Sequence, residues 1–145
     1  MTMNNNLIAT ASILINKPVS LVWRALIDPE KIKEYLFGTQ TETDWKVGSP
    51  IKFRGTWEGK AYEDKGTILK VEKEKVLSYT YWSSMSGKPD VPEHYATVTF
   101  TLIPGADTTK VTITQTNNPS EESRAHSETN WNTVLKTMKE KLELS

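Results

Sequence analysis

The stretch that most constrains the fold is the run of residues 118–144 in the last part of the sequence. Asn118 and Pro119 form a typical helix start, because asparagine caps free N–H groups and proline suits the first helical position, and Glu121 follows three residues after the cap. No glycine or further proline interrupts a helix of about 25 residues, which would be about 37 Å long. Its second half carries apolar residues at helical spacing: Trp131, Val134, Leu135, Met138 and Leu142. Such an amphipathic helix must lie on an apolar surface, which the middle of the chain has to provide.

The middle of the chain alternates apolar and polar side chains with the period of two that β-strands have. We expect strands at residues 7–15, 41–45, 51–58, 61–71, 76–83, 93–103 and 109–116. After the first strand, Pro18 and the pair Asp28-Pro29 open two short helices. Links of hairpin length imply antiparallel neighbours. We therefore predict an α+β fold in one domain, residues 1–145, with a curved antiparallel sheet of six to seven strands wrapped around the long helix.

Composition excludes several classes of protein. The 18 basic residues balance the 18 acidic ones, so no net charge favours nucleic acid or an anionic membrane surface. The absence of cysteine removes disulfides and thiolate chemistry, and the two histidines are too far apart in the sequence for metal-ligand spacing. No apolar run approaches the roughly 20 residues of a membrane span, and the polar residues 1–6 do not resemble a signal peptide. We expect a cytoplasmic protein without a metal or another cofactor.

Several short motifs occur in an order that is typical of one protein family. They are residues 22–26 (VWRAL), 28–30 (DPE), 45–49 (WKVGS), 66–72 (GTILKVE), 77–81 (LSYTY) and 130–135 (NWNTVL). In these motifs the sequence resembles the activator of heat-shock-protein-90 ATPase homologue-like proteins, members of the START and birch-pollen-allergen (SRPBCC) superfamily, which have the helix-grip fold. The resemblance covers nearly the whole chain. One departure is Asn130, where the family usually has glycine, and a side chain there changes how closely the long helix approaches the sheet.

The resemblance implies a cavity between the long helix and the concave face of the sheet. Ligand sites of this kind are mostly apolar with a few polar groups, and tyrosine and tryptophan supply both. We predict that a small hydrophobic or aromatic molecule contacts ten residues: Tyr35, Phe37, Phe53, Trp57, Tyr81, His94, Phe100, Trp131, Leu135 and Met138. Each of these side chains could instead fill a packed core. The hypothesis therefore requires a cavity above about 300 Å³.

His94 is the polar residue with the clearest chemical potential. Strand alternation places it on the same face as Val98 and Phe100, and an imidazole suits acid–base chemistry. A structural or exposed histidine is nevertheless the interpretation that we favour. No Gly-x-Ser-x-Gly elbow and no glycine-rich phosphate loop occurs, so we predict no catalytic residue.

Carboxylates gather around an expected turn at Gly59-Lys60. Glu58, Glu63 and Asp64 alternate with apolar positions, so we expect them on the solvated face of the sheet. Arg54 lies on the same expected strand as Glu58, four residues before it. This cluster gives no catalytic pattern of its own.

Three functions follow from the sequence and the resemblance. The leading hypothesis is binding of a small hydrophobic or aromatic ligand without chemistry. The second is a protein-interaction module related to the chaperone activator, with a chaperone or another protein as partner. The third is a cyclase- or hydrolase-like enzyme that uses His94 with Tyr81 or a carboxylate, which requires His94 to lie inside the cavity.

Overall fold

The computed structural model describes residues 7–144, so the polar segment 1–6 considered above lies outside the described part. One strand, two short helices, six further strands and a long helix follow one another along this part of the chain, with a single 3₁₀ turn before the sixth strand. In order they are β1 (Leu7–Ile15), α1 (Val19–Ile27), α2 (Pro29–Tyr35), β2 (Gln40–Glu42), β3 (Pro50–Trp57), β4 (Lys60–Glu72), β5 (Val76–Tyr81), η1 (Pro92–His94), β6 (Ala96–Pro104), β7 (Thr109–Asn118) and α3 (Glu121–Glu143). The predicted order of elements is confirmed.

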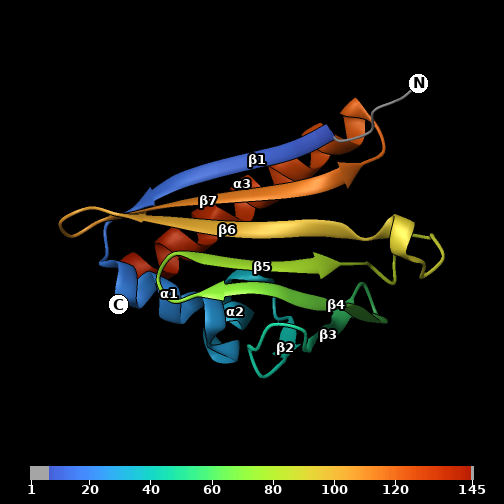
Figure 1. Ribbon diagram of the computed structural model, residues 1–145, viewed down its shortest axis with the longest axis horizontal. Coiled ribbons are helices and arrows are strands. Elements are labelled where there is room, and N and C mark those ends of the chain that lie inside the picture. The colour runs from blue at the N-terminus through green and yellow to red at the C-terminus, as the bar shows by residue number, and fades with distance from the viewer. Residues whose placement is uncertain (1–6, 145) are drawn as a thin grey trace.

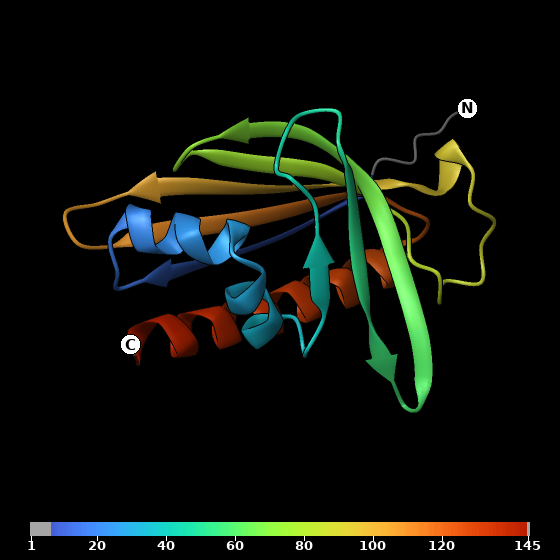
Figure 2. The same cartoon turned by 90° about the horizontal axis from the view of Figure 1, so that it is seen from below.

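All seven strands belong to one antiparallel sheet in the order β1-β7-β6-β5-β4-β3-β2 (Figure 1). Figure 2 shows the three α-helices on one side of this sheet, with the β3–β4 hairpin bending toward the same side. The long helix α3 lies along β1 and β7, while α2 contacts both α3 and β2. This arrangement is the predicted helix-grip fold, in which a curved sheet encloses a long helix.

The apolar stripe predicted on α3 forms part of the core. Val134, Leu135, Met138 and Leu142 are buried, and Trp131 is half-buried. They pack in one cluster with inward-facing side chains of the sheet and of the two short helices. Since propensity alone rarely stabilises a helix in a protein, this packing is what holds α3 in place.

The start of α3 differs from the prediction. Its cap is Ser120, whose hydroxyl accepts a hydrogen bond from the N–H of Ser123 at 3.1 Å, so the prediction of a cap at Asn118 is wrong. Asn118 instead ends β7, and its side-chain amide donates to the carbonyls of Leu7 and Gln115. The asparagine therefore joins β7 to β1, because its amide finds backbone acceptors on the strands before the helix begins.

Charged side chains beside the apolar stripe bind the exposed edge of β1. The carboxylate of Glu128 accepts the N–H of Thr10 at 3.0 Å, and that of Glu143 accepts the N–H directly after β1 at 2.8 Å. The ammonium group of Lys139 donates to the carbonyl of Leu14 at 2.8 Å. An edge strand presents unpaired backbone groups, and α3 satisfies several of them here.

Two local predictions in the sheet also need correction. The turn between β3 and β4 is Glu58-Gly59 rather than Gly59-Lys60, and both residues have positive φ, 49° and 81°. Two such residues match the type I′ turn that suits the twist of a hairpin. The sixth strand begins at Ala96, not at residue 93, because the chain first makes the 3₁₀ turn η1.

Candidate functional site

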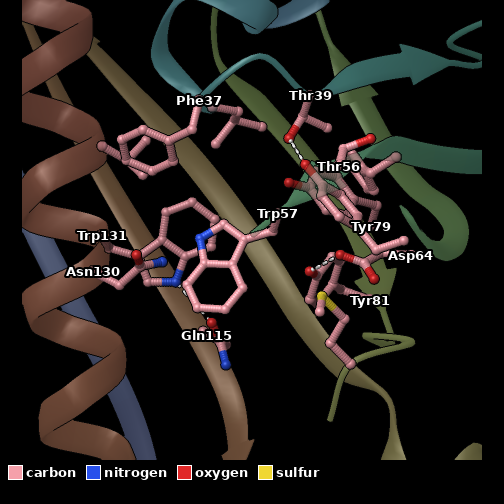
Figure 3. Close-up of a pocket in the computed structure, with 15 residues that line it drawn as sticks. Phe37, Thr39, Thr56, Trp57, Asp64, Tyr79, Tyr81, Gln115, Asn130 and Trp131 are labelled. Carbon is pink, nitrogen blue, oxygen red and sulfur yellow. Dashed lines mark hydrogen bonds between the residues drawn. The ribbon is translucent and has the colours of Figure 1, made fainter. Parts of the chain in front are cut away.

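A cavity of about 270 Å³ lies between α3, the segment after α2, and strands β3, β4 and β5 (Figure 3). Fifteen residues line it: Leu36, Phe37, Thr39, Phe53, Thr56, Trp57, Tyr62, Asp64, Tyr79, Tyr81, Met85, Gln115, Asn130, Trp131 and Val134. Seven of these are aromatic. The volume is slightly below the roughly 300 Å³ that the ligand hypothesis requires, so that requirement is not met and the size of the cavity counts against the hypothesis for all but small molecules.

Three exposed apolar side chains belong to the wall of this cavity. Phe37 is 63% exposed and follows α2 in the left-handed conformation (φ 55°), which is uncommon for a bulky residue. Trp57 is 58% exposed at the end of β3, and Met85 is 45% exposed after β5. Apolar groups left in water in this way mark the open side of the cavity.

Gly55 makes room for one aromatic wall. It lies directly opposite Tyr62 in the β3–β4 pair, and a Cβ on Gly55 would come within 2.4 Å of the Tyr62 hydroxyl oxygen. The ring of Tyr62 therefore lies across the glycine. Its hydroxyl is 2.6 Å from Oγ1 of Thr39, and this hydrogen bond joins β4 to the segment after α2.

Asp64 is a buried carboxylate in the wall, and only 7% of it is exposed. Its Oδ2 accepts the Tyr81 hydroxyl at 2.6 Å, while Oδ1 accepts the N–H and the hydroxyl of Ser84 at 2.9 and 3.2 Å. Burial raises the pKa of the Tyr81 phenol, and the neighbouring Asp64 charge raises it further. The phenol consequently keeps its proton and donates it in the hydrogen bond to Asp64.

The prediction that Asp64 lies on the solvated face is wrong. Neighbouring residues of a strand point to opposite faces, and β4 places Asp64 and Ile68 inside while Glu63 is exposed. Glu63 pairs with Arg54 of β3 at 2.6 Å on the outer face. The even spacing from Asp64 to Ile68 was the signal in the sequence that could have identified the buried carboxylate.

Aromatic contacts fix the remaining walls. The Phe53 ring lies 5.5 Å from that of Tyr79 and 5.8 Å from that of Tyr81, measured between ring centroids. The Trp131 ring meets Phe100 edge-to-face at 5.9 Å. Its indole N–H donates to Oε1 of Gln115 at 2.7 Å, which holds the ring at the cavity.

Half of the ten predicted ligand contacts line the cavity: Phe37, Phe53, Trp57, Tyr81 and Trp131. The other half do not: Tyr35, His94, Phe100, Leu135 and Met138. Leu135 and Met138 are fully buried in the core, and Phe100 packs between Tyr79 and Trp131. The buried hydroxyl of Tyr35 donates to the carbonyl of Ala25 at 2.9 Å, so this side chain joins α2 to α1.

His94 lies outside the cavity wall. The prediction that it sits on the inward face of a strand is wrong, because it ends the turn η1 before β6 starts. Its Nδ1 is 2.8 Å from the carbonyl oxygen of Pro89, so the ring is bound to the loop that precedes the turn.

Sequence reasoning missed ten wall residues, most of them small, polar or on segments between elements: Leu36, Thr39, Thr56, Tyr62, Asp64, Tyr79, Met85, Gln115, Asn130 and Val134.

Two absences hold for residues 7–144. No group of three or more histidine, aspartate or glutamate side chains is placed to hold a metal ion. No helix in that range has the length and the apolar character needed to cross a membrane.

Comparison with known proteins places the chain in a family. The model of the family described as Activator of Hsp90 ATPase homolog 1-like protein matches residues 16–143. No curated protein matches the sequence. Among solved structures, ChR145 from Cytophaga hutchinsonii is 50% identical with a TM-score of 0.85, over 97% of both chains.

More distant structures share the fold. MLL2253 from Mesorhizobium loti is 23% identical with a TM-score of 0.77, over 95% of this chain and 98% of that chain. The Aha1 dimer from Colwellia psychrerythraea is 21% identical with a TM-score of 0.73, over 94% of this chain and 96% of that chain. Since the family model covers most of the sequence, the chain belongs to the family of Activator of Hsp90 ATPase homolog 1-like proteins.

Proposed function

We propose that this protein binds a small hydrophobic or aromatic molecule in the cavity between α3 and the bent end of the sheet. The observation that carries the proposal is a wall with seven aromatic rings that stays partly open to solvent. Exposed apolar side chains at the open side of the cavity support the proposal, because a ligand that covers them removes apolar surface from water, which is favourable. Fixed polar groups, such as the Tyr62–Thr39 pair, would orient the ligand.

The volume limits the size of the ligand. An apolar cavity of about 150 Å³ is large enough for benzene, so about 270 Å³ suits a molecule with one or two rings. Larger lipids would have to extend through the open side.

A thermal-shift screen of small aromatic molecules tests the proposal. A ligand present at about one hundred times its dissociation constant adds about 2.7 kcal/mol of stability. In a domain of this size that raises the Tm by several degrees. A broad panel that leaves the Tm unchanged would count against ligand binding.

Trp57→Ala locates the site. The variant removes an exposed ring from the wall, so the fold should remain intact while ligand affinity falls at least about tenfold. Val47→Ala is the matched control, since Val47 is 66% exposed and lies outside the wall. Equal losses in both variants, measured by calorimetry, would place the ligand elsewhere.

A second candidate function is binding of a protein partner, such as a chaperone, at the same open side. The exposed side chains of Phe37, Trp57 and Met85 favour it, because large apolar groups in water are typical of interaction surfaces. Partner capture with the wild type and with Trp57→Ala tests this candidate. A catalytic function gains no support, because His94 lies outside the cavity wall.

A further inference from the structure

The cavity wall carries negative charge but no positive charge. Asp64 is the single residue with a formal charge among the fifteen that line the cavity, and no lysine, arginine or histidine joins it there. The remaining wall is aromatic, apolar or neutral and polar. A molecule that enters the cavity therefore meets a carboxylate and π-faces, but no positive group.

The Asp64 carboxylate has no cationic partner within residues 7–144. None of the ion pairs found there includes it, and its neighbours Glu63 and Lys65 form their pairs on the outer face, with Arg54 and Asp90. Three hydrogen bonds, from Tyr81 and Ser84, stabilise its oxygens. A buried charge that lacks a counter-ion is unfavourable even when it is hydrogen-bonded.

The carboxylate also has capacity for another donor. An ionised carboxylate offers about four acceptor positions, and the hydrogen bonds from Tyr81 and Ser84 occupy three of them. Figure 3 shows Asp64 beside Tyr81 among the side chains of the wall.

Aromatic rings share the cavity wall with this carboxylate. Tyr81, Tyr79 and Phe53 form one connected set of rings, and Trp57 and Trp131 complete the wall. The π-face of an aromatic ring attracts cations, and cages of such rings recognise ammonium groups. An anion would gain nothing here, because it would face a like charge and the negative faces of the rings.

We propose that the ligand of this cavity is an organic cation, an amine or ammonium group on a small apolar body, with Asp64 as its counter-ion. The inference rests on the proposed ligand-binding function and adds the chemical class of the ligand. The ammonium group donates to the free acceptor position of Asp64, and the apolar body lies among the rings.

Three probes of similar size and different charge test this inference. Calorimetric titration compares phenethylamine, the neutral 2-phenylethanol and the anionic phenylacetate at neutral pH. A charge-assisted hydrogen bond and a cation–π contact together predict that the amine binds at least about tenfold more tightly than the alcohol. Phenylacetate should bind more weakly than either.

Asp64→Asn assigns the preference to the carboxylate. This variant keeps the size of the side chain and removes its charge, so the amine should lose its advantage and bind no more tightly than 2-phenylethanol does to the same variant. Glu63→Gln is the matched control, because it removes the adjacent carboxylate from the outer face and should leave the preference intact. An advantage for the amine that survives in Asp64→Asn would overturn the role of Asp64.

The outcomes separate this inference from the function on which it rests. If the alcohol binds as tightly as the amine to the wild type, the cavity binds ligands but the cation inference is wrong. If no probe and no member of the wider aromatic panel binds, both proposals fail. The wild-type comparison needs no variant, so it decides the matter even if Asp64→Asn does not fold.

Discussion

At the scale of single residues, Gly66 determines how closely β4 approaches β5. A Cβ placed on Gly66 would lie 1.6 Å from the carbonyl oxygen of Thr80, a backbone atom of the neighbouring strand. Next to it, the N–H of Thr67 donates to the Thr80 hydroxyl at 2.9 Å. A side chain at position 66 would therefore push two neighbouring strands apart.

We predict that Gly66→Ala lowers the free energy of unfolding by at least about 3 kcal/mol, because the backbone itself has to move. Gly105→Ala is the matched control. Its Cβ would meet the hydroxyl of Thr108 at 2.4 Å, and a side chain can rotate away. We expect the control to lose less than about 1 kcal/mol in urea unfolding, and equal losses would contradict the role of Gly66.

At the scale of elements, α3 combines two kinds of contact with the sheet. Its apolar stripe lies in the core, and Leu135 is among the residues with no exposed surface. On either side of the stripe, Glu128 and Lys139 bind the backbone of β1. The stripe supplies the free energy of packing, while the charged side chains fix the position of the helix along the strand.

We predict that Leu135→Ala lowers the free energy of unfolding by about 2–5 kcal/mol, because it leaves a cavity in the core. The exposed neighbour Lys136 provides the control, and Lys136→Ala should change stability by less than about 0.5 kcal/mol. Ligand affinity, measured under conditions in which the variant is fully folded, should not change, since Leu135 is not part of the cavity wall. A small loss for Leu135→Ala would show that the helix packs loosely.

At the scale of the whole molecule, buried tyrosines make stability depend on alkaline pH. Burial raises the pKa of Tyr35, Tyr79 and Tyr81 above the ordinary value of 10.0. In the unfolded chain these phenols release protons near that value, whereas in the folded protein they keep them. Stability is therefore complete below about pH 10 and falls as the pH rises further, because the unfolded state then binds fewer protons.

We predict that the free energy of unfolding falls by up to about 1.4 kcal/mol per pH unit for each of these tyrosines above about pH 10. Tyr79→Phe removes one phenol and should make the decline less steep by that amount. Urea unfolding between pH 8 and pH 11.5 measures the slopes. Wild type and variant with the same slope above pH 10 would contradict the prediction.

The fold could be predicted because its signals are local and periodic. The stripe from Trp131 to Leu142 and the alternation in β3 and β6 follow from the spacing of apolar residues alone. Five of the fifteen residues of the cavity wall were predicted as well, since large aromatic side chains on inward faces, such as Phe53 and Tyr81, are visible in the sequence. Family resemblance supplied the place of the cavity between helix and sheet.

The rest of the wall could not be predicted, because its residues come together only in three dimensions. Tyr62 lines the cavity because Gly55 on the next strand leaves room for its ring. Phe100 and Leu135 look like wall residues in the sequence, yet both are buried in the core and neither lines the cavity. Whether an inward aromatic side chain meets a neighbour or a cavity depends on distances between elements that no local pattern encodes.

The sequence by itself determined the order of the elements, the antiparallel sheet and the apolar face of α3, since these depend on side-chain period, caps and turns. Only the tertiary structure decided that Asp64 lies inside an aromatic wall and that His94 lies outside it. The physical reason is the same for both residues. The Asp64 carboxylate accepts hydrogen bonds from Tyr81 and Ser84, which lie on and after the next strand, while the turn η1 takes the imidazole off the strand, and the spacing of apolar residues specifies neither arrangement.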